Sequence, residues 1–451
     1  MPDTPIPPGH DRPGAPRRAP GFFSSRRRAA ICGLLIVLGG FSPIVVRAEE
    51  GTEPITRSLL VPLDHAEPHG ARAALDYELG APFDPAKPTV LVIADGQQFY
   101  VRKGAMAGLQ KEEFGPEFNV VGIIGRGATP AFIEAARNGD GTPDWMSAWR
   151  LFRSDQWIED IEAVRVDLLG RRGKVMLYGA SGGAFLVHQH LARHGEYVSR
   201  AFTACPVDPF EVGALGLNSD RFWDEIGATD PALHEALKSA LARHAEDRAT
   251  LIMTLQRQNF FVPPERLQAE RADLIRAVAA GDEERYARAR KEYQVEEVRA
   301  FFEAKEGIPI RVREYELFFP AGALDRLRST EAVYPDLENQ RNFAAPLLAL
   351  QAESRIPAPA IDRSAPHRLE TEVFVLAGRW DHTVDYRTAV ALAARYPRGT
   401  LFLADDDHMF ASLKESGARD DLLRSSLHDG GASARLRAAL AKAAPHRWTE
   451  R

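Results

Sequence analysis

Short, nearly continuous apolar runs recur along the chain and alternate with stretches of helical spacing. Such runs are typical of buried parallel strands, and we expect strands at residues 89–94, 119–124, 174–180, 198–205, 371–377 and 400–404. Helices are expected at 157–169, 184–193, 386–396 and 435–443. Two earlier stretches, 58–65 and 73–79, suit an antiparallel edge pair. Strands that alternate with helices predict an α/β fold with a mainly parallel sheet.

The pattern changes between about residues 208 and 345. This part is rich in Ala, Leu, Arg and Glu at helical spacing, and helices are expected at 230–245, 264–280 and 282–302. Residues 307–312 are the one place in it where a strand is the alternative. We therefore expect a sheet domain in two parts, 49–207 and 346–451, interrupted by a helical cap at 208–345.

The first 48 residues have the features of a targeting segment. A basic region ends in Arg26-Arg27-Arg28, an apolar stretch follows from Ala29 to Val46, and small residues lead to a cleavage site after Ala48. A signal peptide at 1–48 predicts export to the periplasm or the extracellular medium. The alternative is an uncleaved N-terminal anchor, and only then would the chain contact a membrane.

Composition narrows the classes of function. The chain has 451 residues, 45% of them hydrophobic, and a formal net charge of −6, so nothing in its charge favours a nucleic-acid partner. It has only two cysteines, Cys32 and Cys205, too few for a zinc cluster of the cysteine type. Cys205 ends an apolar run, and we expect it to be a buried structural thiol.

The strand expected at 174–180 leads into Gly179-Ala180-Ser181-Gly182-Gly183, and a helix follows. This is the nucleophile-elbow pattern, in which a serine occupies a sharp turn between a strand and a helix. Small residues on either side allow the strand and the helix to approach closely. The alternative is a glycine-rich turn of an ordinary α/β protein. We favour Ser181 as a nucleophile because its expected partners follow in order.

A serine nucleophile needs a base and an orienting acid, which follow it in the order acid, then histidine. Asp381 comes just after the strand at 371–377, and His408 follows the strand at 400–404. Asp385 competes with Asp381, but its place at the start of a helix is explained by an N-cap role. Alone, His408 would be interpreted as a surface histidine in an acidic loop.

The oxyanion formed by serine attack needs two N–H donors. One is expected from Gly182, the residue after the serine, and the other from the loop after an early strand, where Gln97 is the best candidate. No metal or cofactor is expected, because hydrolysis by such a triad requires neither.

These residues together resemble an α/β-hydrolase of the proline iminopeptidase and tripeptidyl aminopeptidase type. The resemblance is carried by Val61-Pro62-Leu63-Asp64-His65, by the helix that begins at Trp157, by the motif around Ser181, by Gly378-Arg379-Trp380-Asp381 and by Asp407-His408. Such enzymes hold the substrate's free amine with acidic residues of the cap, which implies a role for Glu314 and Glu316. Solvated surface acids are the alternative for both.

The chain departs from this family at the loop after the first buried strand. The family usually has His-Gly-Gly-Pro-Gly there, and this chain has Asp95-Gly96-Gln97-Gln98. The departure leaves the substrate class open. The first hypothesis is a secreted aminopeptidase that acts on short peptides. The second is an esterase or other acyl hydrolase with the same triad and a small-molecule substrate, and the third is a non-catalytic binding protein.

Overall fold

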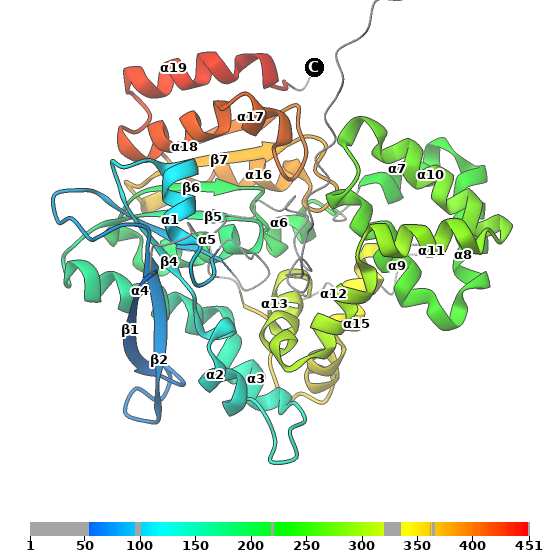
Figure 1. The fold of residues 1–451 in the computed structure, drawn as a ribbon, viewed down its shortest axis with the longest axis horizontal. Helices are drawn as coiled ribbons and strands as arrows, with labels where there is room; N and C mark the ends of the chain where they lie inside the picture. The colour runs from blue at the N-terminus through cyan, green and yellow to red at the C-terminus, as the bar shows by residue number, and fades with distance from the viewer. Residues whose placement is uncertain are drawn as a thin grey trace, which may run out of the picture. The chain divides into compact units, whose positions relative to one another are not determined.

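The computed structural model describes residues 54–94, 101–217, 221–319, 335–360, 362 and 366–449. An eight-stranded sheet with the order β1-β2-β4-β3-β5-β6-β7-β8 organises these residues (Figure 1). The β1–β2 and β2–β4 pairs are antiparallel, and the strands from β4 to β8 are parallel. The strands are β1 (Ile55–Pro62), β2 (Arg72–Leu79), β3 (Thr89–Ile93), β4 (Asn119–Ile123), β5 (Val175–Ala180), β6 (Val198–Ala204), β7 (Glu372–Gly378) and β8 (Gly399–Ala404).

This sheet confirms the predicted fold class and all eight predicted strands. The parallel strands are apolar throughout because helices cover both faces of the sheet. In β5, Val175 and Leu177 belong to one hydrophobic cluster, whereas Met176 and Tyr178 belong to another. The strand order, with its antiparallel edge and its sharp turn after β5, is that of an α/β-hydrolase.

Two sets of helices flank the sheet (Figure 1). The first cluster includes side chains of α4, α5 and α16, and the second includes side chains of α1, α18 and α19. The helices are α1 (Met106–Leu109), η1 (Gln110–Phe114), η2 (Arg126–Ala128), α2 (Pro130–Ala135), α3 (Trp145–Phe152), α4 (Ser154–Leu169), α5 (Gly182–His194), η3 (Gly195–Tyr197), η7 (Pro366–Arg368), α16 (Tyr386–Ala393), α17 (Ala411–Glu415), α18 (Ala418–His428), α19 (Ala434–Ala443) and η8 (Ala444–His446).

Between β6 and β7 the chain forms a helical insertion, which we define as residues 209–352. Its helices are α6 (Pro209–Ala214), α7 (Arg221–Thr229), α8 (Pro231–Arg243), η4 (Ala245–Asp247), α9 (Arg248–Arg257), η5 (Gln258–Phe260), α10 (Pro264–Ala280), α11 (Glu283–Glu292), α12 (Val295–Glu303), η6 (Lys305–Gly307), α13 (Ile308–Phe318) and α15 (Pro335–Ala352). The insertion has its own hydrophobic cluster, built from side chains between Phe222 and Ile310.

Two details of the insertion differ from the sequence prediction. Residues 307–312, for which a strand was the alternative, begin helix α13. Pro309 lies in its first turn, where a missing N–H costs nothing, and nearly every side chain of the helix is buried. The single helix expected at 282–302 is two helices, because Gln294 adopts a left-handed backbone conformation with φ of 54°.

No helix of the described residues is both long and apolar enough to cross a membrane. The predicted signal peptide at residues 1–48 lies outside the part of the chain that the structure describes.

Candidate active site

Ser181 occupies the turn between β5 and α5. Its backbone has φ of 52° and ψ of −124°, a conformation that costs a non-glycine residue about 1–3 kcal/mol. The turn is fixed by its neighbours, since the Ser181 N–H donates to the Ala204 carbonyl oxygen at 2.8 Å. This geometry is the one predicted from the glycine-bracketed serine.

The flanking glycines are required by close backbone contacts. A Cβ atom on Gly183 would lie 2.4 Å from the Ile93 carbonyl oxygen, and one on Gly179 would lie 2.7 Å from the Gly183 carbonyl oxygen. Both distances are far shorter than a van der Waals contact. Only glycine therefore allows β3, β5 and α5 to meet at this corner.

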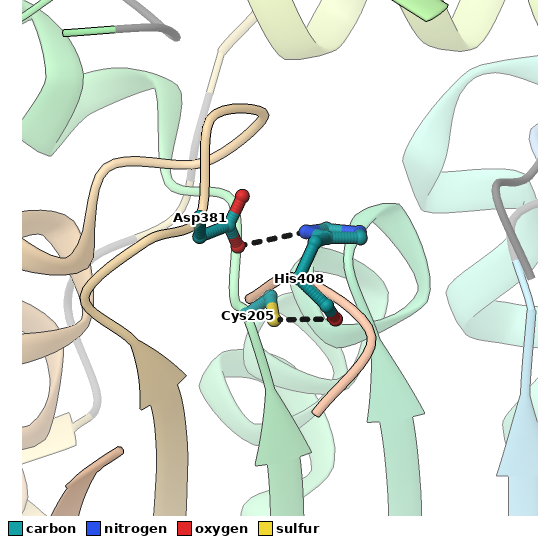
Figure 2. Close-up of side chains that lie close together, drawn as sticks. All are labelled: Cys205, Asp381 and His408. Carbon is teal, nitrogen blue, oxygen red and sulfur yellow. Dashed lines mark hydrogen bonds and ion pairs between the residues drawn. The ribbon is translucent and has the colours of Figure 1, made fainter. Parts of the chain in front are cut away.

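Asp381 and His408 form a buried pair at the carboxyl ends of the parallel strands, the same end of the sheet as Ser181 (Figure 2). Asp381 follows β7, His408 follows β8, and the His408 Nδ1 atom lies 2.7 Å from the Asp381 Oδ2 atom. The other carboxylate oxygen of Asp381 accepts the N–H groups of Thr383 and Val384, each at 2.8 Å. Because an ionised carboxylate can only accept, Nδ1 carries the proton in the neutral imidazole, and Nε2 then has a free lone pair.

Burial and charge act on His408 in opposite directions. Burial disfavours the imidazolium, but the Asp381 carboxylate and, more weakly, Asp407 favour it, so that the pKa of His408 is raised above its usual value. A raised pKa makes the neutral imidazole a stronger base, so this form of the ring accepts a proton readily.

Cys205 lies directly beside this pair (Figure 2). The cysteine follows β6, and its Sγ atom donates to the His408 carbonyl oxygen at 3.3 Å. Burial and the nearby Asp381 carboxylate raise the pKa of its thiol well above the usual value, so the thiol stays protonated. The prediction of a buried thiol is confirmed, and its backbone φ of 45° shows how tightly the strand end turns here.

The helical insertion reaches His408 and the residue after Asp381 through η5. The Asn259 side-chain amide donates to the His382 carbonyl oxygen at 2.9 Å and accepts a hydrogen bond from Arg271. The next residue, Phe260, packs its ring edge-to-face on the His408 ring, with centroids 6.0 Å apart. One turn of the insertion therefore covers the His408 ring and holds the loop that carries Asp381.

A cavity opens at Ser181 between the sheet and the insertion. Its wall is mostly apolar, from residues such as Met253, Phe302 and Phe343, and its charged lining residues among those described are Glu314 and Arg257. Glu314 is buried on α13 and thus lies where the resemblance placed an amine-binding acid.

Glu316 does not line this cavity. One of its carboxylate oxygens accepts the Ser154 N–H at 2.8 Å, and the other accepts a hydrogen bond from Arg313. Burial raises its pKa, against the opposing effect of Arg313. Glu316 therefore joins α13 to α4, and the geometry does not support the substrate-binding role expected for it.

Of the two expected oxyanion donors, the structure describes Gly182 but not Gln97. Gly182 is the first residue of α5, so its N–H belongs to the helix-terminal donors that have no intrahelical acceptor. Gln97 lies outside the described residues. Sequence reasoning missed Arg257, Asn259 and Phe260, because only the packing of the insertion brings them to the site.

No protein-family model matches the chain, and no curated protein matches it. Several solved structures resemble it at low identity. The esterase RhEst1 from Rhodococcus sp. ECU1013 is 12% identical with a TM-score of 0.43, and the match covers 83% of this chain and 99% of that one. Rv0554 from Mycobacterium tuberculosis is 15% identical with a TM-score of 0.39, covering 82% and 97%. The strand order and the turn at Ser181 define the fold.

Proposed function

We propose that this protein is a serine hydrolase and, within that class, an aminopeptidase that acts on short peptides. The observation that carries the class is the 2.7 Å contact between Asp381 and His408 at the sheet edge where Ser181 occupies its strained turn. Three side chains of these types, in this chain order, form the machinery for acyl transfer.

In the proposed mechanism, Ser181 Oγ attacks the carbonyl carbon of the substrate. His408 Nε2 accepts the serine proton and later donates it to the leaving group, while Asp381 holds the proton on Nδ1 and stabilises the imidazolium. The N–H of Gly182 stabilises the oxyanion, with Gln97 proposed as the source of the second donor. Water then releases the acyl group by the same steps in reverse.

The choice of aminopeptidase rests on Glu314. Its carboxylate lines the cavity that contains Ser181, and the surrounding wall is largely apolar. A carboxylate in such a place favours a cationic group on the substrate, because the attraction is strong where water is excluded. A peptide's free amino terminus provides that cation within reach of the serine. The second candidate, an esterase, is favoured by the same apolar wall.

One set of assays tests the class and the substrate together. The purified chain is expected to cleave aminoacyl arylamides, and Ser181→Ala should reduce the rate by at least about 1,000-fold. N-Acetylation of the arylamide should abolish cleavage, because it removes the cation. Activity that survives in Ser181→Ala would refute the triad. Cleavage of p-nitrophenyl esters, with no loss on N-acetylation, would select the esterase.

The role of Glu314 is tested with a matched pair of variants. Glu314→Gln should raise KM for the free-amine arylamide by about 10- to 100-fold, which is the range expected for a lost charged hydrogen bond. Glu353→Gln changes the same residue type at an exposed position in the loop after α15 and should leave KM unchanged.

A further inference from the structure

The second charged residue of the cavity, Arg257, has no role in the proposed chemistry. It ends helix α9 and is only 4% exposed. Its Nε atom donates to the Tyr293 carbonyl oxygen at 2.7 Å, and the Phe260 and Phe261 rings lie 5.8 and 5.0 Å from its guanidinium carbon. The guanidinium is thus fixed by one backbone bond and two aromatic rings at the edge of the cavity.

Arg257 has no ion-pair partner among the described residues. Glu297 acts on it only through space, and the terminal Nη1 and Nη2 nitrogens make no hydrogen bond within the described part of the chain. Burial lowers the pKa of Arg257 to about 10, so the side chain still carries its charge at neutral pH. A buried cation without a carboxylate partner destabilises the fold. Such cations are commonly found where a ligand supplies the missing anion.

A second unsatisfied group lines the same cavity. Gln340 on α15 is 4% exposed, and its Oε1 atom is buried without a hydrogen-bond partner in the described residues. Helices α9 and α15 are joined beside it by a bond from Asn339 to Gln256. The cavity therefore offers a cation for an anionic group and an acceptor for an N–H group.

The shape of the guanidinium and the charges in the cavity restrict the anion. Two free Nη groups in one plane match the two oxygens of a carboxylate. A phosphate dianion would bring two negative charges into a cavity that already contains the Glu314 carboxylate, whereas a carboxylate brings only one. A carboxylate next to an amide N–H is the chemistry of a peptide's carboxyl terminus.

We propose that Arg257 binds the terminal carboxylate of the substrate, with Gln340 accepting an adjacent N–H, so that the site takes short peptides free at both ends. This inference rests on the proposed function, in which Glu314 binds the amino terminus. It names the substrate class as di- and tripeptides and makes blocked or long peptides poor substrates.

The test uses binding, so that it does not depend on turnover. The full chain with Ser181→Ala is titrated calorimetrically with L-alanyl-L-alanine and with its C-terminal amide. The free acid should bind about 10- to 100-fold more tightly than the amide, the range expected for a charge-assisted pair. Adding Arg257→Gln should remove that difference. Arg257→Lys should keep only part of it, because lysine retains the charge but not the two coplanar N–H donors of a guanidinium.

The control is Arg248→Gln, which changes the same residue type at the other end of α9, where Arg248 is more exposed and paired with Glu338. It should leave both affinities unchanged. Equal binding of acid and amide, a difference that persists in Arg257→Gln, or no binding of either peptide at millimolar concentration would each overturn the inference. If the wild-type chain does not cleave arylamides but the Ser181→Ala chain still prefers the free acid over the amide, that result would count against the proposed function and not against this inference.

Discussion

At the scale of single residues, the site depends on the contrast between two histidine nitrogens. Asp381 holds the proton on Nδ1 of His408, and in the proposed mechanism Nε2 accepts the proton of Ser181. The same contact sets the pH at which the base is available. Because the imidazolium cannot accept a proton, the proposed mechanism predicts that activity is lost as the pH falls through the pKa of His408.

We therefore expect the rate of inactivation by a fluorophosphonate to rise with pH, with a midpoint above the ordinary histidine value of about 6.5. Asp381→Asn removes the main group that favours the imidazolium, so the midpoint should fall while the rate drops by up to about 10,000-fold. Asp405→Asn, in an exposed pair with Arg379, is the control and should move neither. A midpoint unchanged in Asp381→Asn would contradict the assignment of the base.

At the scale of elements, a continuous path of hydrogen bonds joins the η5 turn of the insertion to the loop that carries Asp381. Arg271 donates to Asn259, which donates to the His382 carbonyl oxygen. The N–H of the same peptide group, that of Thr383, donates to Asp381. Each hydrogen bond in such a chain polarises the next. Asn259 must be an amide here, because one end meets a donor and the other an acceptor.

We predict that Asn259→Asp slows inactivation by the fluorophosphonate about 10-fold or more, because a carboxylate at residue 259 repels the His382 carbonyl and displaces Asp381. Asn119→Asp is the matched control, since Asn119 is equally buried and joins two segments at the opposite end of the sheet. It should cost stability without slowing the labelling reaction. Equal rates in the two variants would show that Asn259 only packs.

The elements also show what the sequence could and could not predict. The strands were predictable because their apolar runs are buried on both faces. The positions of Ser181, Asp381 and His408 at strand ends were predictable for the same reason, whereas their catalytic roles stay predictions. The sequence did not distinguish Glu314 from Glu316. Two residues apart on a helix, they point to nearly opposite sides, and only the structure shows that Glu314 faces the cavity and Glu316 faces Ser154. Arg257 and Gln340 line one cavity only because α9 packs on α15, and no local sequence pattern encodes that packing.

At the scale of the whole molecule, one fully buried arginine ties three distant segments together. Arg126 forms a two-bond contact with Asp160 on α4, at 2.7 and 2.8 Å. Its remaining nitrogen donates to the carbonyl oxygens of Leu63, after β1, and Leu151, in α3. The edge of the sheet and two helices thus converge on a single guanidinium.

Replacing this residue should destabilise the whole fold. We expect Arg126→Met to lower the free energy of unfolding by about 3–5 kcal/mol, because the buried Asp160 carboxylate loses its arginine and keeps only the contact with His65. The urea midpoint of the folded chain measures the loss. Arg288→Met, in an exposed pair within α11, should shift the midpoint little. A small shift for Arg126→Met would show that water replaces its contacts.

The position of Cys205 gives the molecule a built-in probe of its own motions. The thiol is covered by the loops that carry Asp381 and His408, so a thiol reagent can reach it only when this corner opens. With Cys32 replaced by serine, the labelling rate under native conditions reports the opening equilibrium of the corner that Asp381 and His408 form. A ligand that closes the corner would slow labelling, so occupancy can be followed without any knowledge of the reaction.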